Sequence, residues 1–250
     1  MKEIYMTQFS SDKTLITKEN AYPILKAFAK EYKKQNGTSV PVELVIVGGG
    51  RILLNYGFRE ATQEFDIMVQ SLGLIKNVSY RIADLYNLPD NWLNTDFMRT
   101  ASYSDKLREV SKHFCSFNNG SLEFRTVNGE YLIAMKMVSA REYRNDISDI
   151  VGILIYMKNE SEDFSMDRIN HAIDFLYGKR ENVIKEEVYN KVKEYAKWSV
   201  PELEKEYDVL TQMESQTEHE LKDIKDKYPE VVKEESIDKV IEGLRRRKGR

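Results

Sequence analysis

Two acidic residues separated by a single residue are the strongest candidates for chemistry in this chain. Residues 65–69 alternate like a β-strand; Asp66 lies in this run and Glu64 directly precedes it. Side chains two apart on a strand point to the same face, so we expect the two carboxylates to lie side by side. Such a pair is costly unless a cation lies between them, and hard oxygen ligands suit Mg²⁺. The alternative is two solvated carboxylates on an open face of a sheet.

Three glycines precede the acidic pair. The apolar, β-branched residues 42–47 end in Gly48-Gly49-Gly50, and thirteen residues separate Gly50 from Glu64. Glycines let a ligand approach the backbone closely, and the unpaired N–H groups at a helix start attract anions. A turn of this kind also forms without a ligand. Beside an acidic pair, however, it predicts a phosphoryl or nucleotidyl transfer site.

Other polar residues near these motifs allow a structural and a functional interpretation. Arg59 and Thr62 could contact substrate or simply pair with their neighbours. Lys136, on an otherwise apolar helix, could bind phosphate or extend to solvent along its aliphatic stem. Asp146 and Asp149 are best explained as first-turn residues that a helix dipole stabilises.

A series of helices and strands must position these residues. Residues 89–106 are expected to form a long surface loop with some helical turns, and Pro201 suits the first turn of a new helix. Strands are predicted over residues 42–47, 65–69 and 122–127, and helices over residues 18–35, 51–56, 76–86, 130–143, 146–157 and 165–177.

Composition limits the classes of protein to which the chain can belong. It has 250 residues, 41% of them apolar, and a net charge of only −3, so any contact with a polyanion must come from a local patch. A single cysteine, Cys115, excludes an intramolecular disulfide framework and a cysteine-based zinc site. Apolar runs are too short to span a bilayer and no secretory signal is visible, so we expect a cytoplasmic protein.

The pattern changes after about Gly178. Residues 183–250 are rich in Glu and Lys, with wider hydrophobic spacing, and end in the basic cluster 245–250. We therefore predict one domain over residues 1–178, which carries the motifs above, and a charged helical region over residues 179–250. The basic end is expected to be solvated, with RNA contact as the alternative.

Taken in order, these motifs resemble those of the polymerase-β-like nucleotidyltransferases. That family has a hydrophobic strand, a Gly-Gly or Gly-Ser turn, a helix and then two acidic residues flanking a hydrophobic one. The similarity is closer to the bacterial branch that contains AbiEii-type toxins, where an Arg-x-x-Thr run precedes the acidic pair. The matching positions, which fall within residues 41–157, are Gly49, Gly50, Arg59, Thr62, Glu64, Asp66, the helix 131–137, Ala140-Arg141, Asp146 and Asp149.

The resemblance implies an α+β fold, with a polymerase-β-like core of a small mixed sheet flanked by helices, followed by the helical C-terminal region. It implies that Glu64, Asp66 and Glu123 bind Mg²⁺ or Mn²⁺ and are catalytic, with Glu123 on the next central strand. An ion pair between Glu123 and Arg125 is the alternative there. The residues implied to bind substrate are Gly49, Gly50, Arg51, Arg59, Thr62 and Lys136.

The function implied is Mg²⁺-dependent transfer of NMP from a nucleoside triphosphate to an unidentified acceptor, RNA or protein. A role as the toxin of a toxin–antitoxin pair, with an antitoxin partner, is part of this expectation. The family pattern has Asp where this chain has Glu64. Because Mg²⁺ demands near-ideal octahedral geometry, the alternative is a degenerate nucleotide-binding or regulatory module of the same fold.

Overall fold

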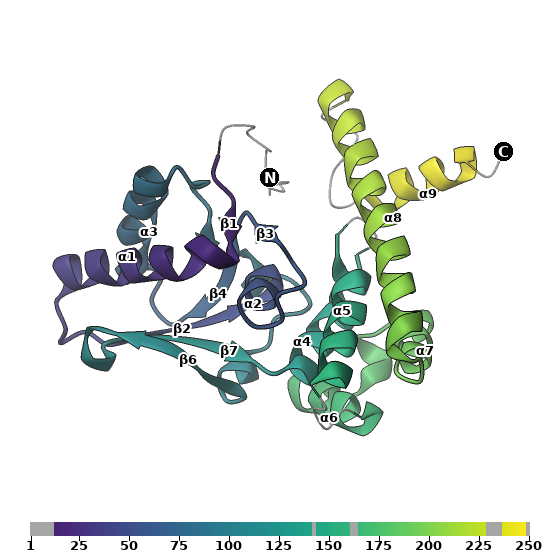
Figure 1. Cartoon of the computed structure of the whole chain (residues 1–250), viewed down its shortest axis with the longest axis horizontal. Coiled ribbons are helices and arrows are strands. Elements are labelled where there is room, and N and C mark those ends of the chain that lie inside the picture. Colours follow the sequence, from purple (N-terminus) through teal and green to yellow (C-terminus); the bar gives the residue numbers. More distant parts are fainter. Residues whose placement is uncertain (1–12, 142–143, 161–164, 229–236, 249–250) are drawn as a thin grey trace.

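The computed structural model describes residues 13–141, 144–160, 165–228 and 237–248, which form a mixed sheet flanked by helices (Figure 1). The strands are β1 (Ile16–Thr17), β2 (Val42–Val47), β3 (Ala61–Thr62), β4 (Phe65–Val69), β5 (Leu93–Asn94), β6 (Ser111–Phe117) and β7 (Leu122–Val127). The α-helices are α1 (Lys18–Asn36), α2 (Gly48–Asn55), α3 (Gly73–Tyr86), α4 (Gly129–Ser139), α5 (Asp146–Asn159), α6 (Met166–Tyr177), α7 (Glu186–Tyr195), α8 (Val200–Lys227) and α9 (Ile237–Lys248).

The main sheet has the order β5-β4-β2-β7-β6. Its central strand β2 runs antiparallel to β4 and parallel to β7, so the sheet is mixed, as expected for an α+β fold. The register pairs Val47, the last residue of β2, with Asp66. The acidic pair therefore lies at the end of the sheet where β2 turns into α2.

Alternation along the strands divides the core between two faces of the sheet. Leu44, Ile46 and Phe124 point to the face that α1 and α3 cover, with which they form one apolar cluster. Val45 and Val47 point the other way, toward α4, α5 and the helices that follow. Figure 1 shows this helical part, α4 to α8, packed against one end of the sheet.

The apolar cluster of the helical part continues across residue 178. It includes Ile150 of α5 and Ile173 of α6 as well as Val192 of α7 and Leu203 of α8. The segments 1–178 and 179–250 thus contribute to a common core. Helix α8 begins at Val200 with Pro201 in its first turn, as predicted, and its N-terminus is capped by Ser199 and Glu202.

The three predicted strands have the predicted limits, whereas β6 was not predicted. It is an edge strand, paired only with β7 among the described residues, and a bulge between His113 and Cys115 breaks its alternation. A strand with one free edge and an interrupted period gives little hydrophobic signal. The predicted helix 130–143 ends earlier, at Ser139, because Ala140 adopts a left-handed conformation with φ 37°.

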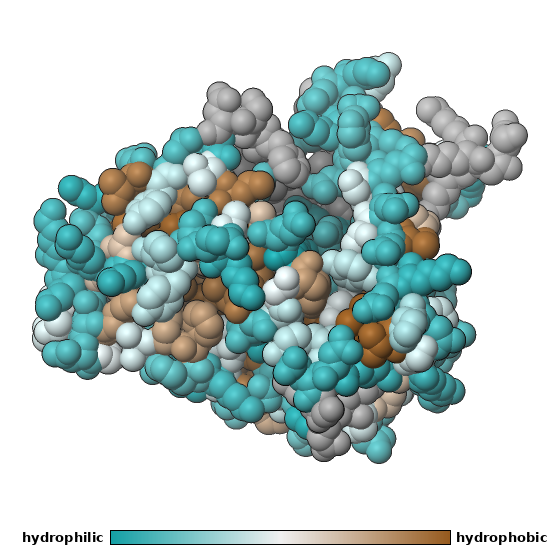
Figure 2. All heavy atoms as spheres, in the orientation of Figure 1, coloured by the Kyte–Doolittle hydropathy of each residue, from teal (hydrophilic) through white to brown (hydrophobic). Residues whose placement is uncertain are grey.

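The outer surface fits the high charge content of the chain. Figure 2 shows a largely hydrophilic face on which hydrophobic side chains form separate patches. In the parts of the chain that the structure describes, no helix combines the length and apolar character needed to cross a bilayer.

A glycine in the middle of α5 brings the loop after α2 against the helical part. A Cβ atom on Gly152 would lie 2.5 Å from the Phe58 ring, so the ring rests directly on the helix backbone. Phe58 also stacks on Tyr56, with ring centroids 6.1 Å apart. The residue after Phe58 is Arg59, and this contact therefore helps to place Arg59 next to α5.

We predict that Gly152→Ala destabilises the protein by about 1–3 kcal/mol, because the added methyl group must displace Phe58. Denaturant unfolding followed by circular dichroism measures the effect. The matched control is Gly243→Ala, in the exposed interior of α9, where an added Cβ would meet no atom within 4 Å. Alanine favours helix over glycine, so the control should not lower stability. Equal losses in both variants would contradict the packing at Gly152.

Candidate functional site

Asp66 lies against the glycine turn at the end of β2. Gly48 has φ +61°, a conformation that favours glycine, and a Cβ atom there would lie 2.7 Å from Oδ2 of Asp66. The carboxylate therefore touches the backbone where α2 begins. No side chain caps the N-terminus of α2, so its first N–H groups are available to an anion.

Glu64 directly precedes β4 and is held by two amides. The Nδ2 atoms of Asn91 and Asn94 donate to Oε2 of Glu64 at 3.2 and 3.0 Å. Asn94 reaches this position because β5 runs parallel to β4 and pairs Asn94 with Asp66. The two carboxylates thus belong to neighbouring, rigidly held positions.

Both carboxylates hold protons more tightly than usual. Burial, followed by repulsion from Asp66, raises the pKa of Glu64 to about 7. Burial also raises the pKa of Asp66, against the opposing charges of Lys136, Arg141 and Arg144. A raised pKa means that the ionised pair is under strain, which an added cation would relieve.

Lys136 forms a buried ion network with the start of α5. Its Nζ atom lies 2.8 Å from Asp146 and 2.8 Å from Asp149. Burial would lower the pKa of Lys136, but these two carboxylates outweigh burial and raise it. Burial would likewise raise the pKa of Asp146, but Lys136 and Arg141 outweigh it and hold that pKa well below its usual range. Asp146 and Asp149 do lie in the first turn of α5, as predicted, yet they are paired as well as near the helix dipole.

Arg59 joins the glycine turn to α5. Its Nη2 atom lies 3.1 and 3.0 Å from the two carboxylate oxygens of Asp149. Its Nη1 atom occupies the space beside Gly49, where a Cβ atom would lie only 2.2 Å away. Thr62 lies on the same side of Gly49, and its hydroxyl donates to the carbonyl of Glu64 at 3.1 Å. Gly49, Arg59 and Thr62 are therefore gathered as the sequence suggested.

Gly50 and Arg51 are placed for packing rather than for contact with a ligand. A Cβ atom on Gly50 would lie 2.4 Å from the Phe65 ring. Arg51 is 7% exposed, its Nε donates to the carbonyl of Val127 at 2.7 Å, and its guanidinium lies 4.7 Å from the centre of the Tyr56 ring. The prediction that Gly50 and Arg51 bind substrate therefore finds no support in the geometry.

Glu123 does not join the acidic pair. It faces the same side of the sheet, but it lies on β7 four residues before Val127, the residue level with Val47 and Asp66. Four residues of strand span about 13 Å, too far to share a cation. Glu123 instead contacts Arg125 at 2.8 Å, so its prediction as a third metal ligand is not supported. Within the described residues, no three His, Cys, Asp or Glu side chains form a cluster able to hold a metal ion.

A family model described as a nucleotidyltransferase of unknown function (DUF6036) matches residues 24–207. The chain belongs to this nucleotidyltransferase family. Comparison with curated proteins and with solved structures gave no match. The match covers β2, the glycine turn, the acidic pair and the ion network, and it extends past residue 178 into α8.

Some residues of the candidate site were not predicted. Asn91 and Asn94 were assigned to a polar surface loop, and only the pairing of β5 with β4 shows that they hold Glu64. Arg144 was not singled out, although its charge acts on both Glu64 and Asp66. The only feature of the sequence that could have indicated this role is the position of Arg144, four residues after Ala140 and just before the start of a helix.

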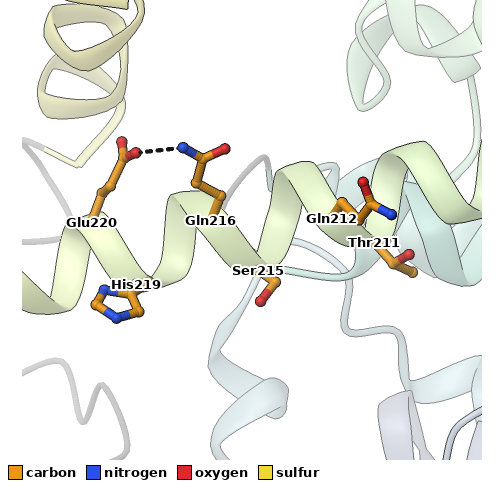
Figure 3. A pocket seen from close by; sticks show the side chains of 6 residues that line it. All are labelled: Thr211, Gln212, Ser215, Gln216, His219 and Glu220. Carbon is orange, nitrogen blue, oxygen red and sulfur yellow. Dashed lines mark hydrogen bonds between the residues drawn. The ribbon is translucent and has the colours of Figure 1, made fainter.

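One hollow in the surface is lined by a single helix, α8. It has a volume of about 610 Å³ and is lined by α8 residues between Thr211 and Glu220. In Figure 3, Gln216 and Glu220 point to one side of the helix, whereas Ser215 and His219 point to the other. Its polar groups do not converge, so the acidic pair remains the candidate site of the nucleotidyltransferase.

The strain in the acidic pair predicts a stabilising substitution. The folded state binds a proton at Glu64 between the ordinary pKa of 4.5 and about 7, so stability falls as pH rises through this interval. In metal-free buffer at pH 8, Glu64→Gln should therefore raise the melting temperature by roughly 2–4 °C, the effect of about 1 kcal/mol in a chain of this size.

Most of the gain should disappear near pH 4.5, where Glu64 is protonated in the folded state and about half protonated in the unfolded state. Glu123→Gln is the matched control, since it removes a carboxylate paired with Arg125 and should not stabilise the protein. Thermal unfolding of the three proteins at both pH values gives the comparison. A loss of stability in Glu64→Gln at pH 8 would show that the pair is not strained.

Proposed function

We propose that this chain transfers a nucleoside monophosphate from a nucleoside triphosphate to an acceptor, with Mg²⁺ or Mn²⁺ held by Glu64 and Asp66. One observation carries the proposal. Two half-buried carboxylates with raised pKa values lie close together at one end of the sheet, and that of Asp66 touches Gly48, a glycine with no room for a side chain, at an uncapped helix start. Membership of a nucleotidyltransferase family supports the same reaction.

The donor set fits a hard divalent cation. Both candidate ligands are carboxylates, and burial beside a like charge leaves the pair short of positive charge. Glu64 and Asp66 would hold the cation, which would supply positive charge against the negative charge that develops during transfer. Two carboxylates plus substrate phosphates are a usual set of ligands for Mg²⁺.

Other residues would orient the triphosphate or hold the carboxylates in place. The N–H groups at the start of α2, at Gly48 and Gly49, would bind phosphate oxygens. Arg141 and Arg144 supply positive charge near the acidic pair. The ammonium group of Lys136 is paired with Asp146 and Asp149. Its positive charge would therefore act on Asp66 through space, without direct contact.

Asn91 and Asn94 would fix the longer side chain of Glu64, where the family pattern has Asp. Two amide donors on one carboxylate oxygen restrict its rotation and leave the other oxygen for the cation. The extra methylene of Glu64 is thereby accommodated by the site. The acceptor class, RNA or protein, and a toxin role with an antitoxin partner stay predictions.

Label transfer tests the proposed reaction. The protein is incubated with each α-³²P-labelled nucleoside triphosphate, Mg²⁺ or Mn²⁺, and total cellular RNA or protein. Label should appear in one of the two acceptor fractions, and Asp66→Asn should reduce transfer roughly 100-fold or more, because it removes a metal ligand. Glu123→Gln should transfer at the wild-type rate.

Calorimetric titration with Mn²⁺ and nucleoside triphosphate gives a readout independent of the acceptor. Triphosphate binding should require the cation and should weaken in Asp66→Asn. Binding that is indifferent to the cation, with no label transfer, would instead identify a nucleotide-binding or regulatory module. Equal transfer by wild type and Asp66→Asn would remove the basis of the proposed reaction.

A further inference from the structure

Helix α8 lies beside the first turn of α5, which carries the ion network of the site. It packs along α5 (Figure 1), and its Leu203 and Leu210 belong to the same apolar cluster as Ile150. Two polar residues on this side of α8, Tyr207 and Glu214, are seven residues apart and therefore point in nearly the same direction.

Glu214 caps α5 from a different helix. Its side chain is 6% exposed, and Oε1 accepts from the backbone N–H of Ser148 at 3.2 Å. Ser148 is the third residue of α5, whose N–H group usually bonds to the residue that precedes the helix. That residue, Asn145, makes no such bond. Glu214 therefore replaces the missing cap, next to Asp149.

Tyr207 supports the loop that delivers Arg59. Its hydroxyl lies 3.5 Å from the carbonyl of Phe58, and the two rings pack edge to face with centroids 5.8 Å apart. Phe58 immediately precedes Arg59, which binds Asp149. α8 thus contacts both sides of the Arg59–Asp149 bridge, one through Tyr207 and the other through Glu214.

We propose that α8 is part of the nucleotide site and that Tyr207 and Glu214 are positioning residues for the Arg59–Asp149 bridge. This inference rests on the proposed function, because the bridge lies between the glycine turn and the network around Lys136. Without the two contacts, the start of α5 and the Phe58–Arg59 loop are held together less tightly, by the packing of Phe58 on Gly152 and by the bridge itself. The space that Arg59 fills beside Gly49 then changes, and with it the phosphate-binding turn.

Substitutions at Glu214 separate positioning from simple packing. Glu214→Gln keeps an oxygen acceptor for the Ser148 N–H group, whereas Glu214→Leu fills the space without one. Glu214→Leu leaves the Ser148 N–H group without its acceptor, but this loss is partly offset because burial of the Glu214 carboxyl already costs free energy and raises its pKa to about 7. Glu214→Leu should therefore stay folded but lose the cap, which makes it more informative than a truncation.

Two measurements on the full chain, at a temperature well below unfolding, test the proposal. Hydrogen exchange should speed up in Glu214→Leu for peptides that cover residues 57–62 and 145–150. The affinity for Mn²⁺ with nucleoside triphosphate should fall about tenfold, the effect of losing one hydrogen bond at a buried group. Glu214→Gln should restore both values nearly to those of wild type.

Glu204→Gln, at an exposed position of the same helix, is the matched control and should change neither measurement. Tyr207→Ala should speed exchange mainly in residues 57–62. Unchanged exchange and affinity in Glu214→Leu would overturn the proposal. If the wild type binds no triphosphate, the proposed function fails, but the exchange measurements still decide whether α8 positions the bridge.

Discussion

A buried carboxylate, that of Asp149, joins the two parts of this molecule. It is 2% exposed, and it is satisfied by Arg59 from the sheet side and by Lys136 from the helical side. A buried charge that lacks a partner costs several kcal/mol, so this contact ties the glycine turn, α4 and α5 into one arrangement. The candidate site lies where these elements meet, and its geometry depends on that bridge.

The carboxylates of the site differ in the partners that they have. Asp146 and Asp149 have close cationic partners, and burial of these groups is offset by ion pairs. Glu64 has only amide donors in the described contacts, and its pKa is raised. Two types of carboxylate thus occur side by side. One type is paired within the scaffold, and the other is the one that we propose accepts a cation.

The glycines divide in a similar way. Gly48 faces the acidic pair and Gly49 faces Arg59, whereas Gly50 makes room for Phe65 beneath the turn. Each of the three glycines therefore makes room for a different side chain, two of them charged and one aromatic. Helix α8 adds a further layer, because it supplies a cap to α5 and a ring to the Phe58 loop. Through these contacts, the charged C-terminal third packs against the elements that carry the candidate site.

The sequence alone determined the local order of the site. Period-two alternation set the limits of β4 and β7, and a short apolar, β-branched run set those of β2. Glycines followed by an acidic pair indicated a nucleotidyltransferase, a family that the chain does belong to. These features depend on residues close together in the chain, where periodicity and turn chemistry act. The candidate residues Asp66, Arg59 and Gly49 were singled out for the same reason.

Tertiary structure decided which distant residues meet. Because of the register of β7 against β2, Glu123 lies about four residues of strand away from the acidic pair. The parallel pairing of β5 with β4 places Asn94 beside Glu64. Packing of α8 on α5 brought in Glu214, 66 residues from Ser148. Strand register and helix packing are set by the combined burial of many side chains, so no local pattern in the sequence specifies them.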